Sequence, residues 1–187
     1  MQIEDTALEG VKILRPRRFE DARGFFCEVW NRDVLARAGI VMDFVQDNHS
    51  LSRSTGTVRG LHFQAPPRAQ DKLVRAGAGT VFDVAVDIRR GSPSYGKWLG
   101  VELSAENGLQ LLIPKGFLHG FVTRTPDAEL LYKCTDSYAP DCDGAVYFAS
   151  PEIGIDWGIA EDAAILSDKD RAATRFADFQ SPFVFEG

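Results

Sequence analysis

Residues 72–88 read KLVRAGAGTVFDVAVDI, and this stretch decides the fold class. It contains two short segments rich in Val and other strand-forming residues, 72–76 and 80–88, with Gly77 and Gly79 between them. Segments of this kind, separated by glycines, are typical of antiparallel strands joined by a tight turn. The sequence therefore predicts two strands joined by a hairpin or turn here, and the same pattern continues on both sides of them.

Further strand-like segments are separated by turn signals at steps of roughly ten residues. Such connections are too short for the crossover helices of a parallel sheet, so an antiparallel sandwich or barrel is predicted rather than an α/β fold. The other predicted strands cover residues 24–30, 57–63, 98–103, 109–114 and 129–134.

Helical pattern is confined to two short places. Asn31 is a candidate N-cap for a helix that Gly39 ends, and Ser167 is a candidate N-cap for a turn through residues 168–175. No repeat or linker divides the chain, so one domain spanning residues 1–187 is predicted. The aromatic tail, residues 177–187, is expected to pack back on this domain or onto a second subunit.

The charge balance restricts the possible partners. The chain carries 21 Lys plus Arg against 27 Asp plus Glu, which gives a net charge of −6. Nucleic acids and anionic membranes require clustered positive charge, so neither is expected, whereas a small anionic ligand needs only a few well-placed arginines. The acidic opening segment lacks the apolar run of a signal peptide, so a cytoplasmic protein is expected.

Neither a disulfide framework nor a metal site is predicted. Cys27, Cys134 and Cys142 form no C-x-x-C pair. The spacing Pro-x-Gly-x-x-His that ends at His119 resembles the second motif of the metal-binding cupins, but the stretch that begins at His62 lacks their His-x-His and Glu. A metal cupin is therefore the less favoured alternative.

Strand alternation places His62 on one face of its segment and Leu61 and Phe63 on the other. This segment alone also permits a plain alternative, a hydrogen-bonded histidine on a half-polar sheet face. Because Arg59 and His62 are three residues apart in the sequence, alternation separates them, and only a β-bulge or an arginine from a neighbouring subunit would place both in one site.

A series of short motifs runs in order along the chain. They are Asp21-x-Arg23-Gly24-x-Phe26, Gln46-Asp47-Asn48-x-Ser50, VRGLHFQ at 58–64, KLVR at 72–75, DVAVDIR at 83–89, Ser104-x-Glu106-Asn107, residues 110–121, Tyr132-Lys133-Cys134 and LSDKD at 166–170. Together they resemble the dTDP-4-dehydrorhamnose 3,5-epimerase family, over nearly the whole chain. The resemblance implies an all-β fold, a cupin-type antiparallel jelly-roll barrel with a few short helices.

The resemblance also implies an activity, the conversion of dTDP-4-dehydro-6-deoxy-D-glucose to dTDP-4-dehydro-L-rhamnose in dTDP-L-rhamnose biosynthesis, without a metal or other cofactor. Carbons 3 and 5 of this sugar flank the C4 ketone, so each can lose its proton as the ketone becomes an enolate. Return of the proton to the opposite face inverts the centre. The reaction needs a base, a group that stabilises the enolate oxygen, and an acid.

Four residues take these catalytic roles by resemblance. His62 is the base, Asp170 orients it, Lys72 lies near the C4 oxygen, and Tyr132 returns a proton to the other face. Each has a plain alternative: an exposed carboxylate at a helix start for Asp170, a strand-edge lysine for Lys72, and a core aromatic for Tyr132. Asp168 competes with Asp170 as the orienting carboxylate.

The resemblance further implies a homodimer with residues crossing between subunits, and a set of substrate-binding residues. Arg23 and Arg59 suit the diphosphate, Tyr138 suits stacking on the thymine ring, and His119 suits the keto oxygen or the sugar hydroxyls. The other predicted contacts are Phe26, Glu28, Gln46, Asn48, Asp143 and Lys169.

Three departures from the family pattern are expected around the nucleotide and sugar pocket. Asp71 stands where a glycine is common and could pair with Lys72, Asp143 replaces a glutamate, and residues 148–151 read FASP in place of a Trp-Asn-Asp-Pro stretch. Two alternatives to the double epimerase stay open here. One is a mono-epimerase of another deoxysugar pathway, and the other is a non-catalytic jelly roll that binds a sugar nucleotide.

Overall fold

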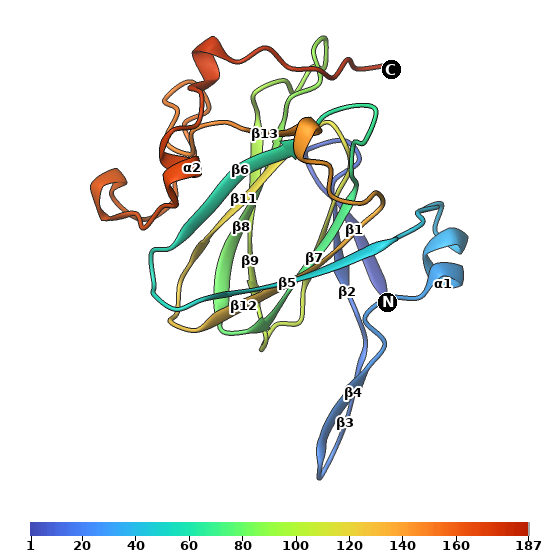
Figure 1. Ribbon diagram of the computed structural model, residues 1–187. Coiled ribbons are helices and arrows are strands. Elements are labelled where there is room, and N and C mark those ends of the chain that lie inside the picture. Colours follow the sequence, from blue (N-terminus) through green and yellow to red (C-terminus); the bar gives the residue numbers. More distant parts are fainter. Residues whose placement is uncertain (187) are drawn as a thin grey trace.

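Antiparallel strands make up most of the structure, a computed structural model that describes residues 1–186 (Figure 1). The first strands are β1 (Gln2–Asp5), β2 (Lys12–Arg15), β3 (Arg18–Asp21), β4 (Gly24–Cys27), β5 (Gln46–Ser52), β6 (Val58–Gln64) and β7 (Lys72–Ala78). They are followed by β8 (Thr80–Asp87), β9 (Trp98–Ser104), β10 (Gln110–Ile113), β11 (Phe117–Thr123), β12 (Ala128–Cys134) and β13 (Asp143–Ala145).

Two sheets face each other and form the barrel (Figure 1). One has six strands in the order β1-β2-β10-β7-β12-β5, the other has five in the order β13-β6-β11-β8-β9, and every pairing between these strands is antiparallel. The predicted all-β jelly-roll class is confirmed. The two predicted strands are present as β7 and β8, but they do not pair as a hairpin: a turn at Gly79 passes the chain from one sheet to the other, so β7 pairs with β10 and β12 and β8 with β9 and β11.

Alternation along β8 sorts its side chains between two hydrophobic clusters. Val81 and Ala85 face the space between the sheets, whereas Val84 and Val86 pack on the outer side of the five-stranded sheet. The segment from Val146 to Phe183 covers that outer side, and Phe183 itself is buried there. The aromatic tail therefore packs back on the domain, one of the two predicted outcomes.

The outer face of the six-stranded sheet has a smaller cover. Leu73 and Leu112 pack there against Leu35 and Ile40, which lie in and just after helix α1 (Arg32–Arg37). Asn31 caps α1 by accepting hydrogen bonds from two backbone N–H groups, and Gly39 follows its end with a φ of +80°. Both predicted helix signals are confirmed at this site.

The second predicted helix is also present but shorter. Helix α2 (Asp168–Arg171) begins after Ser167, whose hydroxyl accepts a hydrogen bond from the backbone N–H of Asp170. It ends well before the predicted limit at residue 175, because Thr174 is extended and forms a β-bridge with Val146. The remaining helical turns are 3₁₀ helices at Pro140–Cys142, Glu161–Ala163 and Phe176–Asp178.

Two strands that build the cavity were not predicted from the sequence. Strand β5 reads QDNHSLS and lacks a hydrophobic pattern, while β11 reads FLHGFVT and is buried along its whole length. Because both faces of β11 are covered, its residues show no alternation. The predicted strand 24–30 was too long, since β4 ends at Cys27 and the chain then turns towards α1.

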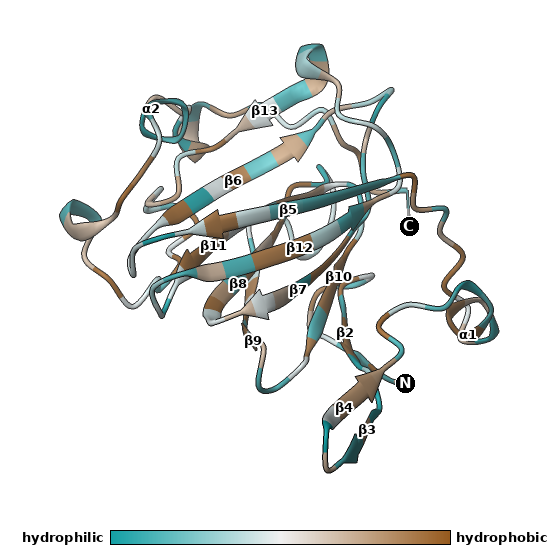
Figure 2. Ribbon diagram, turned by 60° about the horizontal axis from the view of Figure 1, so that its bottom comes forward, coloured by the Kyte–Doolittle hydropathy of each residue, from teal (hydrophilic) through white to brown (hydrophobic). Residues whose placement is uncertain are grey.

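The hairpin formed by β3 and β4 extends away from the barrel (Figures 1 and 2). Three phenylalanines on it are exposed, and Phe26 is the most exposed at 71%. Such a group of exposed aromatic side chains on a two-stranded hairpin is typical of a surface that a protein partner covers. None of the helices within residues 1–186 has the length and apolar character to cross a membrane.

Candidate active site

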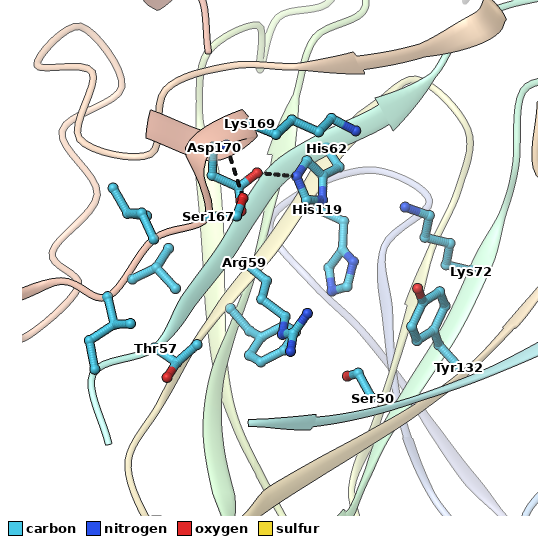
Figure 3. Close-up of a pocket in the computed structure, with 14 residues that line it drawn as sticks. Ser50, Thr57, Arg59, His62, Lys72, His119, Tyr132, Ser167, Lys169 and Asp170 are labelled. Atoms are coloured by element: carbon cyan, nitrogen blue, oxygen red, sulfur yellow. Dashed lines mark hydrogen bonds and ion pairs between the residues drawn. The ribbon is translucent and has the colours of Figure 1, made fainter. Parts of the chain in front are cut away.

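A cavity of about 380 Å³ opens between the two sheets (Figure 3). Its walls come from β5, β7 and β12 of one sheet, β6 and β11 of the other, and helix α2 with the loop before it. All four residues that the resemblance assigns to catalysis line it: His62, Lys72, Tyr132 and Asp170. The fold therefore brings together residues that are separated by up to 108 positions in the chain.

His62 and Asp170 form a hydrogen-bonded pair, with 2.5 Å between Nε2 and Oδ1 (Figure 3). Asp170 is only 3% exposed, which excludes the alternative of an exposed helix-start carboxylate, and Asp168 is exposed instead. Burial by itself would raise the pKa of Asp170, but hydrogen bonding and charge from His62, with hydrogen bonds from Ser167 and the Gly60 backbone, lower that pKa overall. An ionised Asp170 accepts a hydrogen bond from Nε2–H of His62, which leaves Nδ1 as the ring nitrogen that is available to a substrate.

A β-bulge in β6 brings Arg59 to the same cavity. His62 pairs with His119 of β11 and Arg59 pairs with Phe121, so three steps along β6 match two along β11. Arg59 is held by Ser52, whose hydroxyl accepts from Nε at 3.1 Å, and by the carbonyl of Leu51. The arginine and His62 therefore lie in one site within one chain, and no neighbouring subunit is needed to place Arg59.

Gly60 makes this bulge possible. Its φ of +129° is one that L side chains rarely adopt, and a Cβ added there would lie 2.6 Å from Cα of Gly120 on β11. Only glycine fits this close approach of the two strands. The position of Arg59 relative to His62 thus depends on Gly60.

His119 lines the cavity beside His62 and has its own carboxylate. Nε2 of His119 lies 2.9 Å and 3.1 Å from the two carboxylate oxygens of Asp83. Asp83 is fully buried in β8, and His119 is 7% exposed. With Nε2–H directed at Asp83, the neutral imidazole of His119 leaves Nδ1 able to accept a hydrogen bond, and a protonated imidazole could donate one.

Lys72 is a half-buried lysine on the cavity wall. Burial lowers its pKa below the ordinary lysine value, and the nearby Cys134, Asp83 and Asp143 partly oppose that shift. Asp71 does not pair with Lys72, contrary to the expectation from the sequence. The Asp71 carboxylate instead accepts from the Thr135 hydroxyl at 2.9 Å and from the Lys115 backbone N–H at 3.0 Å, so it faces away from Lys72.

Tyr132 follows Lys72 along the same wall, from strand β12 (Figure 3). Burial raises its pKa, and the positive charge of Arg59 partly opposes the shift. The phenol is therefore protonated at neutral pH and can donate a proton, while Arg59 stabilises the phenolate that this leaves. Tyr132 packs against the inner core, so the core-aromatic interpretation is also partly right.

A second cavity, of about 330 Å³, adjoins the first and shares His62, Lys72, Tyr132 and Lys169 with it. The predicted substrate contacts Gln46, Asn48, Tyr138 and Asp143 line it. Asp143 accepts hydrogen bonds from Lys169 and, at 3.2 Å, from the Tyr138 hydroxyl. Tyr138 is exposed, so one face of its ring is open to a stacking partner.

Three predicted substrate contacts, and one of the predicted departures from the family pattern, lie outside both cavities. Arg23, Phe26 and Glu28 are exposed on or after the β3–β4 hairpin and line neither cavity. Arg23 is paired with Asp21. Residues 148–151 were expected near the substrate pocket and are not: Phe148 is 1% exposed and packs on Trp157 in the outer cluster, which makes this departure a core substitution.

Asp83 and Ser50 were missed as members of the site. Asp83 carried a usable signal, because a carboxylate at an inward position between Val81 and Ala85 requires a buried partner. Ser50 carried a weaker signal, since it ends the motif Gln46-Asp47-Asn48-x-Ser50, two of whose other members were predicted as substrate contacts. Within residues 1–186, no three His, Cys, Asp or Glu side chains are grouped as a metal site would require.

Known proteins resemble this chain closely in sequence and structure. The family model for dTDP-4-dehydrorhamnose 3,5-epimerase matches residues 5–178. A protein of that name from Pseudomonas aeruginosa is 50% identical over 179 residues, covering 95% of this chain and 97% of the relative.

Two solved structures are informative. The epimerase RmlC from Legionella pneumophila, in complex with dTDP-4-keto-L-rhamnose, matches with a TM-score of 0.91 at 44% identity, covering 96% of this chain and 94% of that one. The 3′-monoepimerase ChmJ from Streptomyces bikiniensis, in complex with dTDP-quinovose, matches with a TM-score of 0.86 at 31% identity, covering 93% and 87%. The chain belongs to the dTDP-4-dehydrorhamnose 3,5-epimerase family of isomerases.

Proposed function

We propose that the cavity epimerises C3 and C5 of dTDP-4-dehydro-6-deoxy-D-glucose, with His62 as the base and Tyr132 as the acid. The observation that carries these roles is the pairing of His62 with a buried carboxylate in the same cavity as Tyr132 and Lys72. The imidazole removes the proton from carbon through Nδ1. Asp170 stabilises the imidazolium that forms, as the carboxylate of other His-Asp pairs does.

The negative charge then moves to the C4 oxygen as the enolate forms. Lys72, which lines the same cavity, stabilises that oxygen, and a stabilising donor of this kind contributes about 3 kcal/mol in other enzymes. His119 supports the same oxygen in its protonated form, with Asp83 balancing the charge. Tyr132 returns a proton from the side opposite His62, which inverts the carbon.

Substrate binding follows from the adjoining cavity. Arg59 suits the diphosphate through charge-assisted hydrogen bonds, and Tyr138 with Gln46 and Asn48 suits the thymidine. The chemistry of these residues requires no metal and no organic cofactor, because the ketone of the substrate is the electron sink. The single domain that we propose for the chain functions in the cytoplasm, where its free cysteines stay reduced.

The functional unit that we propose is a homodimer in which the β3–β4 hairpin of one subunit completes the site of the other. The hairpin carries Arg23 and the exposed Phe26, and it extends from the barrel without reaching its own cavity (Figure 1). An exposed aromatic patch beside an arginine fits a surface that closes over an anionic substrate.

Mixed dimers test this arrangement. The His62→Ala and Arg23→Ala variants are each expected to lose most activity, and dimers formed from the two together should regain it in one of their two sites. If Arg23 served its own subunit, each site in the mixed dimer would still lack one residue, and no activity would return.

The epimerase activity itself is tested by proton NMR of the substrate in D₂O without added metal, with C3 and C5 followed separately. Deuterium uptake at both positions, abolished by His62→Ala, is the expected result. Uptake at C3 alone would instead identify a mono-epimerase, the activity that the name of the ChmJ relative gives. Binding of dTDP without uptake at either carbon would identify a non-catalytic binding module.

A further inference from the structure

Ser50 has a buried hydroxyl that no protein group satisfies. It lies on β5, on the cavity wall opposite the His62–Asp170 pair (Figure 3). Its oxygen is shielded from solvent and has no hydrogen-bond partner, and it is the one side-chain atom in this situation among residues 1–186. A buried hydroxyl without a partner is unfavourable for folding, so its place in a reaction cavity points to a partner that arrives with the substrate.

The neighbours of Ser50 on the same face of β5 are satisfied. Asn48 donates to Cys134 and accepts from Gln46, and the Ser52 hydroxyl accepts from Arg59. These residues lie two positions to either side of Ser50, so all three point to the same side of the strand. Ser50 is therefore the only polar residue of this row whose hydrogen-bonding capacity is unused.

The structure of the proposed substrate limits which of its groups can hydrogen-bond the Ser50 hydroxyl. The proposed sugar has hydroxyls at C2 and C3 only, because C1 bears the diphosphate, C4 is a ketone and C6 is a methyl group. The C3 hydroxyl changes direction when C3 is inverted, whereas the C2 hydroxyl keeps its configuration throughout the reaction. C2 also adjoins C1, whose diphosphate we assign to Arg59, and Arg59 is anchored to the residues directly after Ser50.

We propose that Ser50 hydrogen-bonds the C2 hydroxyl of the sugar and makes the enzyme selective for 2-hydroxylated over 2-deoxy substrates. This inference rests on the proposed function. Because no bond at C2 forms or breaks in the reaction, the contact binds the ground state and the transition state alike, so it lowers KM and leaves kcat unchanged.

A cycle of two enzymes and two substrates tests the contact. Wild-type protein and Ser50→Ala are assayed with dTDP-4-dehydro-6-deoxyglucose and with its 2-deoxy counterpart. Each single change, in the enzyme or in the sugar, is expected to lower kcat/KM about tenfold through KM, the effect of one hydrogen bond. Making both changes together should cause no further loss. Losses that add instead would overturn the inference.

Thermal stability provides a second test, because this substitution should stabilise the free enzyme, whereas most substitutions of buried residues destabilise a protein. Removing an unpaired buried hydroxyl should raise the Tm of the free enzyme by about 2–4 °C. The matched control is Ser104→Ala on β9, because the Ser104 hydroxyl is satisfied by the Asn107 backbone N–H at 2.9 Å and lies outside both cavities. The control should lower Tm and leave KM unchanged, and a fall in Tm for Ser50→Ala would show that Ser50 has a partner in the free protein.

The outcomes separate this inference from the proposed function. If wild-type enzyme exchanges deuterium at C3 and C5 of the normal substrate and the cycle is additive, only the role of Ser50 is wrong. If the wild-type enzyme exchanges at neither carbon, the proposed function fails and the Ser50 inference fails with it.

Discussion

His62 and His119 lie directly opposite each other on the adjacent antiparallel strands β6 and β11. Each is bound through Nε2 to a carboxylate from another part of the fold: Asp170 in α2 for His62, and Asp83 on β8 for His119. The same sheet face thus presents two oriented imidazoles to one cavity. Their surroundings differ, since the His62 side chain is about one-third exposed and His119 is almost fully buried. This difference suits His62 to proton transfer and His119 to holding the substrate oxygen.

Replacing Asp170 with asparagine tests the orientation of His62. The amide fills the same space but cannot stabilise the imidazolium, and it permits the wrong tautomer, so kcat should fall by about 10³–10⁴. Asp168→Asn is the control, because Asp168 is exposed on the same helix and should keep full activity. Steady-state kinetics and circular dichroism of both variants suffice. Equal losses in the two variants would contradict the assignment of Asp170.

Replacing Tyr132 with phenylalanine should separate proton exchange from inversion. His62 can still remove a proton and return a deuteron to the same face, so deuterium uptake should continue at a reduced rate while inverted product falls by at least 10²-fold. Proton NMR in D₂O measures both quantities in one experiment. Tyr95→Phe is the control, since Tyr95 packs on Phe176 away from both cavities. Normal inversion by Tyr132→Phe would show that another group supplies the proton.

Gly60→Ala should inactivate the enzyme through the bulge in β6. A methyl group there meets the backbone of Gly120, so the strands must separate or the bulge must shift, and either change moves Arg59 away from His62. We expect a loss of about 2 kcal/mol or more in the free energy of unfolding together with a large fall in kcat/KM. Gly39→Ala is a comparison variant with positive φ but open space around it, and it should be destabilised less and stay active. Urea unfolding and kinetics of the two variants decide the point.

Acid should destabilise the protein through Asp87 and Asp170. Burial acts to raise the pKa of Asp87, but hydrogen bonds from Arg89, Ser92 and Ser94 outweigh burial and lower the pKa below 3.8, the ordinary value for aspartate. A lowered folded-state pKa means that the stabilisation is present above pH 3.8 and is lost as the pH falls through the folded-state pKa.

Urea unfolding between pH 6 and pH 2 measures this dependence. Asp87→Asn should be less stable than the wild type at pH 6, and its stability should fall less as the pH decreases. A parallel pH dependence in the two proteins would exclude Asp87 as a source of the acid sensitivity.

Local sequence signals predicted much of the fold. The caps at Asn31 and Ser167 use side-chain oxygens that bond the first N–H groups of their own helices, so they act within a few residues and are visible in sequence. The glycines of the turn between β7 and β8 and the apolar alternation of β8 are equally local. Two cavity strands that were not predicted, β5 and β11, differ because β5 lines a polar cavity and β11 is covered on both faces, so neither shows alternation.

The sequence by itself determined the all-β class, the two helix starts and, through its motifs, the family and the residues expected in the cavity. Only the tertiary structure decided how these residues meet. It placed Arg59 beside His62 through the bulge at Gly60, gave His119 a partner in Asp83, and turned Asp71 away from Lys72. The physical reason is that caps and turns are set by neighbouring residues, whereas register shifts and buried polar pairs depend on strands far apart in the chain.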